Sequence, residues 1–159
     1  MREAIEEVAQ FYSIDPDWIE AVVRIESNYA TMPKPRWEKH LQEHSYGLGQ
    51  FLPSTVLWMI DTPHRFRFPP DISSALARAK TALPSRGEKA LNEVLHEEEV
   101  GLYMVGAYLH YLLDRYDGDI VKAVAAYNAG SARYTEQGHF VNQWHVDKFT
   151  EALTEIGAR

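Results

Sequence analysis

Residues 14–28, IDPDWIEAVVRIESN, form the stretch that decides the fold, because they predict a helix with an acid on its apolar side. Asp15 suits the N-cap, where its side chain can accept from a free backbone N–H, and Pro16 suits the first helical position. One face of this helix, at the i, i+3, i+4 and i+7 spacing, comprises Ile19, Val22, Val23 and Glu26. A carboxyl group therefore stands where a core residue is expected.

The position of Glu26 has a chemical consequence. Removing a carboxyl group from water disfavours its charged form and raises its pKa. A glutamate that stays protonated near neutral pH can serve as a general acid. The alternative interpretation is that Glu26 ends its helix at a solvated edge, and residues further along the chain are needed to decide between the two.

Size and composition predict a single domain over residues 1–159. With 45% hydrophobic residues in 159, the chain is long enough for one sizeable core and too short for two ordinary domains. The sequence has no cysteine, which excludes disulfides and thiolate metal sites. Its formal net charge of −7 argues against nucleic acid as a partner. No run approaches the length of a membrane span, and the first residues lack the apolar stretch of a secretory signal.

The spacing of apolar residues predicts a mainly α fold. They recur at helical intervals almost throughout, and no set of alternating strands stands out. Helices are expected at residues 2–12, 16–27, 53–60, 72–83, 88–96, 98–116, 120–127 and 146–156. Long proline-containing loops are expected at 29–46 and 61–71, and the first, which follows Glu26, is a candidate cleft wall. The sequence also holds four Trp, nine Tyr and six Phe, residue types that can line a groove.

Two further motifs follow Glu26. Residues 45–55 read SYGLGQFLPST, where Gly47 and Gly49 permit a tight turn before a helix that begins near Pro53. Residues 125–131 read AAYNAGS, a helix end marked by a glycine. Taken alone, each is an ordinary turn or cap.

In order and together with the segment RIESNY at 24–29, these motifs resemble the successive signatures of the soluble lytic transglycosylase (SLT) family, which is related to goose-type lysozymes. The segment GAYLHYLLDRYDGD at 106–119 is similar to the long helix and turn that precede the family's Tyr-Asn segment. The resemblance covers roughly residues 8–60 and 98–134. It implies a lysozyme-like helical domain with a substrate cleft.

The resemblance also implies roles for individual residues. Glu26 would be the single catalytic acid and base, with Ser27 beside it among the substrate-binding residues. Gln50 would bind the sugar near the scissile bond. Tyr127 would hydrogen-bond the catalytic carboxylate, and Asn128 would help to shape the site.

Three features depart from the family pattern. Gly49 stands where many members carry methionine, so the sequence does not determine the shape of the cleft at that point. Leu102 takes the place of a common asparagine in the long helix. The stretch 61–97 is longer than in a minimal family domain and is interpreted as an insertion.

The activity implied by the resemblance is that of a peptidoglycan lytic transglycosylase. Such an enzyme cleaves the β-1,4 bond between N-acetylmuramic acid and N-acetylglucosamine and leaves a 1,6-anhydromuramic acid end. We therefore expect peptidoglycan glycan strands as the partner, a monomer, and no metal or other cofactor. The expected location is the periplasm, the cell wall or a phage virion, and the lack of a leader favours a phage or modular origin.

Three alternatives stay open. A muramidase or chitinase would hydrolyse the same type of bond, with Glu38 or Glu43 as a second carboxylate that activates water. Residues 40–44, HLQEH, match the inverted zinc-peptidase pattern, whose third ligand would come from 97–99. The third alternative is a glycan-binding module without activity, although binding alone does not require a buried acid.

Overall fold

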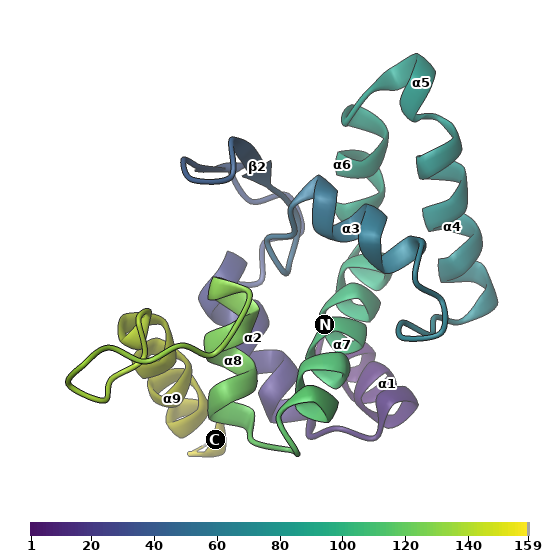
Figure 1. Cartoon of the computed structure of the whole chain (residues 1–159). Coiled ribbons are helices and arrows are strands. Elements are labelled where there is room, and N and C mark those ends of the chain that lie inside the picture. The colour runs from purple at the N-terminus through teal and green to yellow at the C-terminus, as the bar shows by residue number, and fades with distance from the viewer. Residues whose placement is uncertain (159) are drawn as a thin grey trace.

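The computed structural model describes residues 1–158 and is built around one long central helix (Figure 1). The helices are α1 (Arg2–Tyr12), α2 (Pro16–Ser27), α3 (Pro53–Ile60), α4 (Pro70–Thr81), α5 (Leu83–Arg86), α6 (Lys89–Leu95), α7 (Glu98–Arg115), α8 (Ile120–Ala129) and α9 (Gln143–Gly157). The central helix, α7, packs against α1, α2, α4, α6 and α8. The expectation of a mainly α fold is confirmed.

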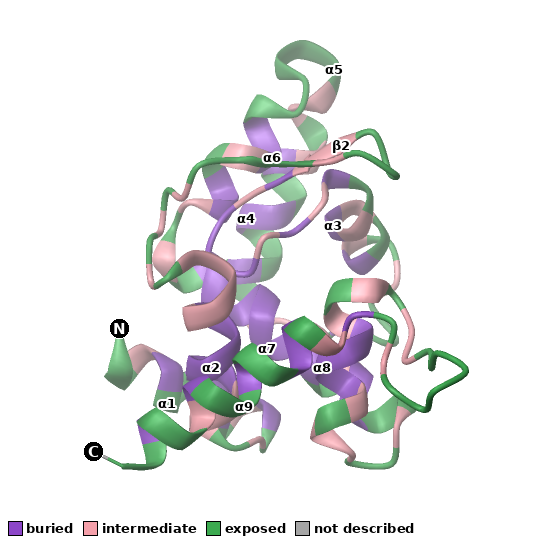
Figure 2. Ribbon diagram, turned by 90° about the vertical axis from the view of Figure 1, so that its left-hand side faces the viewer, coloured by how far each residue is buried: buried purple, intermediate pink, exposed green. Residues whose placement is uncertain are grey.

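The hydrophobic core is centred on α7, which is buried on nearly all sides. Its side chains Leu102, Met104 and Leu109 have no exposed surface, and Figure 2 shows buried residues running through α7 and α8. At Gly106 a Cβ atom would lie 2.5 Å from Val8 Cγ1 and 2.7 Å from Tyr12 Cδ2. The missing side chain thus lets α1 lie directly on the central helix.

Helix α2 forms as its sequence predicts. The Asp15 carboxylate accepts from the backbone N–H of Asp17 at 2.9 Å, Pro16 takes the first helical position, and the helix ends at Asn28 in the left-handed conformation with φ 50°. Its buried face packs on α9, α1 and α7. Glu26, in the last turn, therefore lies close to α9, to the end of α8 that carries Tyr127, and to Arg36 in the segment that follows.

Three features differ from the expectations. Residues Arg36–Glu38 (β1) and Glu43–Ser45 (β2) form an antiparallel hairpin with Arg36 opposite Ser45. Strands of three residues are too short to produce a readable alternation. Helix α9 begins at Gln143 instead of 146, and the fourth predicted helix lies at Pro70–Thr81 and is followed by the separate short helix α5.

Residues 61–97, interpreted above as an insertion, contain α4, α5 and α6, which rise together as an arm beside α3 (Figure 1). The base of the arm is anchored where the Tyr12 hydroxyl donates to the Arg67 carbonyl at 2.7 Å. Within residues 1–158, none of the helices is both long and apolar enough to cross a bilayer.

Candidate active site

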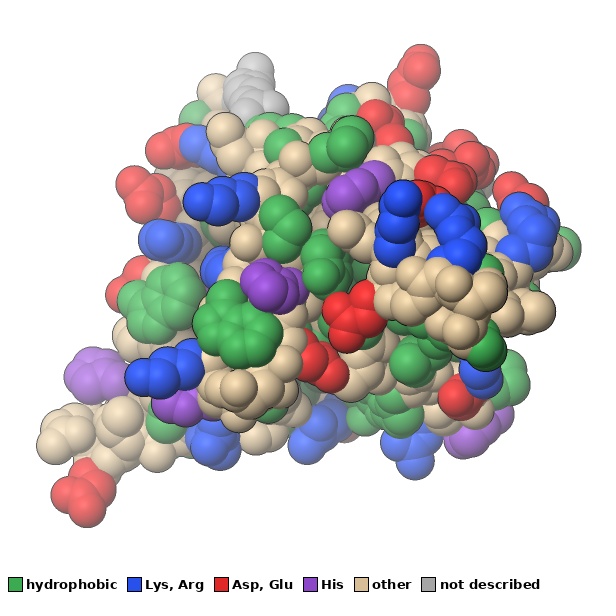
Figure 3. Space-filling view, turned by 90° about the horizontal axis from the view of Figure 1, so that it is seen from above, with side chains coloured by type: hydrophobic (Ala, Val, Ile, Leu, Met, Phe, Trp, Pro, Cys, Tyr) green, Lys and Arg blue, Asp and Glu red, His purple; other side chains and the backbone are tan. Residues whose placement is uncertain are grey.

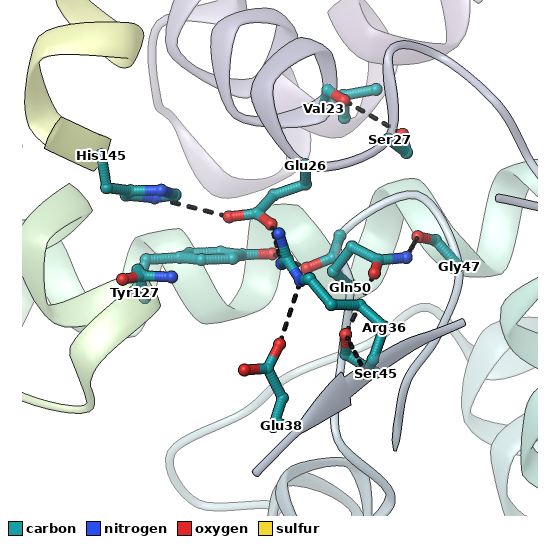
Figure 4. Close-up of polar contacts among 12 residues, drawn as sticks. Val23, Glu26, Ser27, Arg36, Glu38, Ser45, Gly47, Gln50, Tyr127 and His145 are labelled. Atoms are coloured by element: carbon teal, nitrogen blue, oxygen red, sulfur yellow. Dashed lines mark hydrogen bonds and ion pairs between the residues drawn. The ribbon is translucent and has the colours of Figure 1, made fainter. Parts of the chain in front are cut away.

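The side chain of Glu26 is only 3% exposed and points into a pocket between α2, α8 and the hairpin (Figure 4). Counting its open mouth, the pocket holds about 500 Å³. It is lined by Glu26, Arg36, Glu38, Leu41, Ser45, Gln50, Phe51, Leu52, Thr55, Tyr108, Tyr127 and Asn128. The three motifs found in the sequence and the loop 29–46 therefore meet at one place.

Burial raises the pKa of Glu26 to about 7, although the nearby cations Arg36 and Lys148 act to lower it. Taking the carboxyl group out of water disfavours its charged form by more than the two cations favour it. Near neutral pH both protonation states of Glu26 are consequently populated. That is the property needed for a group that first gives and then takes a proton.

Arg36 contacts the acid directly. Its Nη2 atom donates to Glu26 Oε2 at 2.9 Å, and its Nε atom donates to Glu38 Oε1 at 3.0 Å. The sequence does not predict Arg36 as a site residue, because it lies in an expected loop that contains no motif. Only the pairing of β1 with β2 brings the arginine over the end of α2.

His145 contacts the other oxygen of the same carboxyl group. Its Nε2 atom lies 3.4 Å from Glu26 Oε1, and its side chain is 5% exposed. Burial, together with repulsion by Arg36 and Lys148, lowers the pKa of His145 to about 4, so the imidazole is neutral at pH 7. The sequence does not predict His145 as a site residue either, because it lies one residue before the expected start of the last helix.

Gln50 is held by a tight turn that begins at Gly47. Its Nε2 donates to the Gly47 carbonyl at 3.1 Å, and its Oε1 accepts from Ser45 Oγ at 3.0 Å. Gly47 has φ 74°, and a Cβ there would lie 2.5 Å from the Leu95 carbonyl oxygen. The turn therefore needs glycine for both conformation and space, and it presents Gln50 at the pocket wall.

Tyr127 lies under the acid but bonds to a different group from the one expected. Its hydroxyl donates to the Gly49 carbonyl at 3.1 Å instead of to Glu26. The phenol hydroxyl can donate only one hydrogen bond, and the carbonyl in the turn before α3 accepts it. Burial raises the pKa of Tyr127 well above its usual value, so the ring adds no charge beside the acid.

Gly49 leaves no empty space in the cleft. A Cβ at this position would lie 2.4 Å from Phe51 Cε2 and 2.6 Å from the Tyr127 hydroxyl. The rings of Phe51, Tyr108 and Tyr127 pack on one another, with centroids 5.0–5.9 Å apart. Aromatic rings thus occupy the volume that a side chain at position 49 would need.

The remaining two predicted residues differ in their placement. Asn128 lines the pocket, and its Oδ1 accepts from Asn142 Nδ2 at 3.0 Å. Ser27 instead donates back along its own helix to the Val23 carbonyl at 3.0 Å, and it does not line the pocket.

The residues of the zinc-peptidase pattern do not share a helix face. His40 lies in the hairpin turn, whereas Glu43 and His44 lie on β2. The Glu43 carboxylate accepts from Ser54 Oγ at 2.7 Å, and the His44 ring packs on Trp37 with centroids 4.8 Å apart. The expected helix is therefore absent from residues 40–44, and the prediction that the two histidines share a helix face is wrong. Within residues 1–158, no group of three His, Asp or Glu side chains is placed to hold a metal ion.

Exposed apolar side chains gather on the two segments beside the pocket. Residues 30–42 carry Met32, Trp37 and Leu41, which are 72%, 49% and 59% exposed. The segment 131–144 carries Tyr134 and Trp144, each 53% exposed. Figure 3, which looks down on the side of the hairpin and α5, shows hydrophobic, histidine and acidic side chains next to one another near the middle of the face.

No protein-family model and no curated protein matches this chain. Among solved structures it is similar to an inactive mutant of the lytic transglycosylase Slt from Pseudomonas aeruginosa, with a TM-score of 0.62 and 19% sequence identity. The similarity covers 99% of this chain and 24% of the other, so this chain spans about a quarter of the length of that protein. The fold is therefore the lysozyme-like helical fold of SLT domains, as the sequence analysis expects.

Proposed function

We propose that this chain is a peptidoglycan lytic transglycosylase in which Glu26 is the catalytic acid and base. The observation that carries the proposal is the burial of one carboxyl group, with its pKa near 7, in a pocket at the centre of an SLT fold. The Slt structure of similar fold is that of an inactive mutant in which a glutamate is replaced by glutamine. Gln50, Tyr127 and Asn128 would shape the site around the sugar.

The reaction needs one group that acts twice. Protonated Glu26 donates its proton to the bridging oxygen of the β-1,4 bond, and the C–O bond to the muramic acid anomeric carbon breaks. The N-acetyl group of the substrate stabilises the positive charge at that carbon. Ionised Glu26 then takes the proton of the muramic acid 6-hydroxyl, whose oxygen bonds to the anomeric carbon, so the enzyme ends in its starting state and no water is consumed.

Among residues 1–158, Glu38 is the one carboxylate besides Glu26 that lines the pocket, and its contact with Arg36 favours this route over hydrolysis. Glu38, which lines the pocket, is 36% exposed and accepts from Arg36. Glu43 does not line the pocket and accepts from Ser54. His145 is a weak base, because burial and repulsion by Arg36 and Lys148 lower its pKa to about 4. A hydrolase would need one of these groups to activate water.

Mass spectrometry of the products from purified peptidoglycan tests the proposal. A transglycosylase releases anhydro-muropeptides that resist borohydride, whereas a muramidase releases reducing ends. Glu26→Gln should abolish cleavage and retain binding to sacculi. Reducing products, or full activity of Glu26→Gln, would contradict the proposal, and a chain that binds sacculi without cutting them would be a glycan-binding module. The proposed place of action is the bacterial cell wall, reached from the periplasm or from a phage virion.

A further inference from the structure

The contact between Arg36 and Glu26 opposes the role of Glu26 as an acid. A guanidinium 2.9 Å from a carboxylate favours the ionised form, whereas the first step requires the proton. Among the residues that the structure describes, Arg36 is the one hydrogen-bond donor to Glu26. In the unliganded enzyme this contact keeps the pKa of Glu26 lower than burial alone would make it, so part of the acid is ionised near neutral pH.

Arg36 also has a second carboxylate within reach. Its Nε atom already donates to Glu38 Oε1 at 3.0 Å, two residues along the same strand. Its side chain is 43% exposed, in contrast to the 3% of Glu26, so the guanidinium stands at the mouth of the pocket. Rotation about the arginine side-chain torsions can release Glu26 while the contact with Glu38 is kept.

We propose that Arg36 is a positioning residue that holds Glu26 in the free enzyme and passes to Glu38 when a glycan fills the pocket. This inference rests on the proposed function, because it names what couples substrate binding to the acid. A sugar ring in the pocket takes the place of the guanidinium beside Oε2 and excludes water. Both changes favour the protonated carboxyl, so Glu26 gains its proton when the substrate is bound beside it.

The other groups that face Glu26 do not provide this coupling. From α9, His145 is neutral and Lys148 acts from a distance to lower the pKa of Glu26. From α8, Tyr127 is neutral because burial raises its pKa. From β1, Glu38 acts to raise the pKa of Glu26. Arg36 is thus the charge that both touches the acid and is exposed enough to move.

The pH profiles of Arg36→Gln and Glu38→Gln test the proposal. The profile of kcat/KM reports the free enzyme and that of kcat reports the complex. In the wild type, kcat should decline at a higher pH than kcat/KM. Arg36→Gln should move the kcat/KM decline upward by about one pH unit and close the gap. Glu38→Gln should move the kcat/KM decline to lower pH. It should also lower kcat by about twofold to fivefold, because Arg36 then keeps Glu26 as its partner.

A matched control is Arg86→Gln, which removes a guanidinium that donates to Glu93 at 2.6 Å on the arm and should leave both profiles unchanged. A readout independent of turnover is the pKa of Glu26 by carbon NMR in wild type and Arg36→Gln. It should be higher in the variant whether or not the chain cleaves peptidoglycan. An unchanged Glu26 pKa in a folded Arg36→Gln protein, or coincident declines in the wild type, would overturn the inference, whereas loss of cleavage products alone would overturn only the proposed function.

Discussion

His145 Nε2 lies 3.4 Å from Glu26 Oε1, and both side chains are almost completely buried, at 5% and 3% exposure. The two residues come from α9 and α2, helices near opposite ends of the chain that pack against each other. Because the imidazole is neutral at pH 7, it contacts the acid without placing a positive charge beside it. We expect the α2–α9 interface to set both the orientation and the protonation of Glu26.

Replacing His145 with Phe should lower kcat with little effect on KM. Phenylalanine keeps the buried volume but removes the polar neighbour of Oε1, at a cost of about 1 kcal/mol, or fivefold to tenfold in rate. His145→Gln, which keeps an amide near the carboxyl, should retain more activity. Steady-state kinetics with purified peptidoglycan measure this, and the exposed His110→Phe is the control. Full activity of the Phe variant would show that only the buried volume at this position matters.

Glu26→Gln should stabilise the fold at high pH while it removes activity. The pKa of Glu26 is raised from 4.5 to about 7, so the folded state binds more protons than the unfolded state between these values. Stability therefore falls as pH rises through this window, and an uncharged glutamine avoids that loss. Chemical denaturation should show the variant more stable by about 1–3 kcal/mol at pH 8. The difference should vanish below pH 4.5, and its persistence there would contradict the burial argument.

Gly49→Met, which introduces the residue common in the family, should damage this protein instead of improving it. Even the Cβ would lie 2.4 Å from Phe51 and 2.6 Å from the Tyr127 hydroxyl. Overpacking of this kind costs about 1–3 kcal/mol and should displace Tyr127 from the pocket wall. Thermal denaturation and activity assays check this. Gly157→Ala is the control and should be neutral or stabilising, because an added Cβ would meet nothing within 4 Å outside its own turn of helix.

Trp37→Ala should raise KM and leave kcat nearly unchanged. Trp37 is 49% exposed on the hairpin beside the pocket, and an indole can stack on the face of a sugar ring. Loss of one such contact is worth about 1–2 kcal/mol, which is fivefold to thirtyfold in KM. Pull-down on insoluble peptidoglycan with Glu26→Gln as background separates binding from cleavage. Val121→Ala, at an exposed apolar residue on α8, should bind as the parent does.

The sequence by itself determined the helices whose signals are local. Asp15 and Pro16 start α2 because a cap and a preset φ act on neighbouring backbone groups, and the helix ends at Ser27 as expected. The same periodicity placed Glu26 on the buried face. The glycine turn at Gly47 was equally readable, because a positive φ, here 74°, is a local backbone property that favours glycine.

Only the tertiary structure decided what surrounds Glu26. Arg36 reaches it through a hairpin whose three-residue strands have no readable pattern, and His145 reaches it through the packing of α9 on α2. Tyr127 was expected to hydrogen-bond the acid, but its hydroxyl donates to the Gly49 carbonyl. Caps and periodicity act over a few residues, whereas these contacts join segments far apart in the chain. Their distances, and hence the pKa of the acid, are set by how the helices pack.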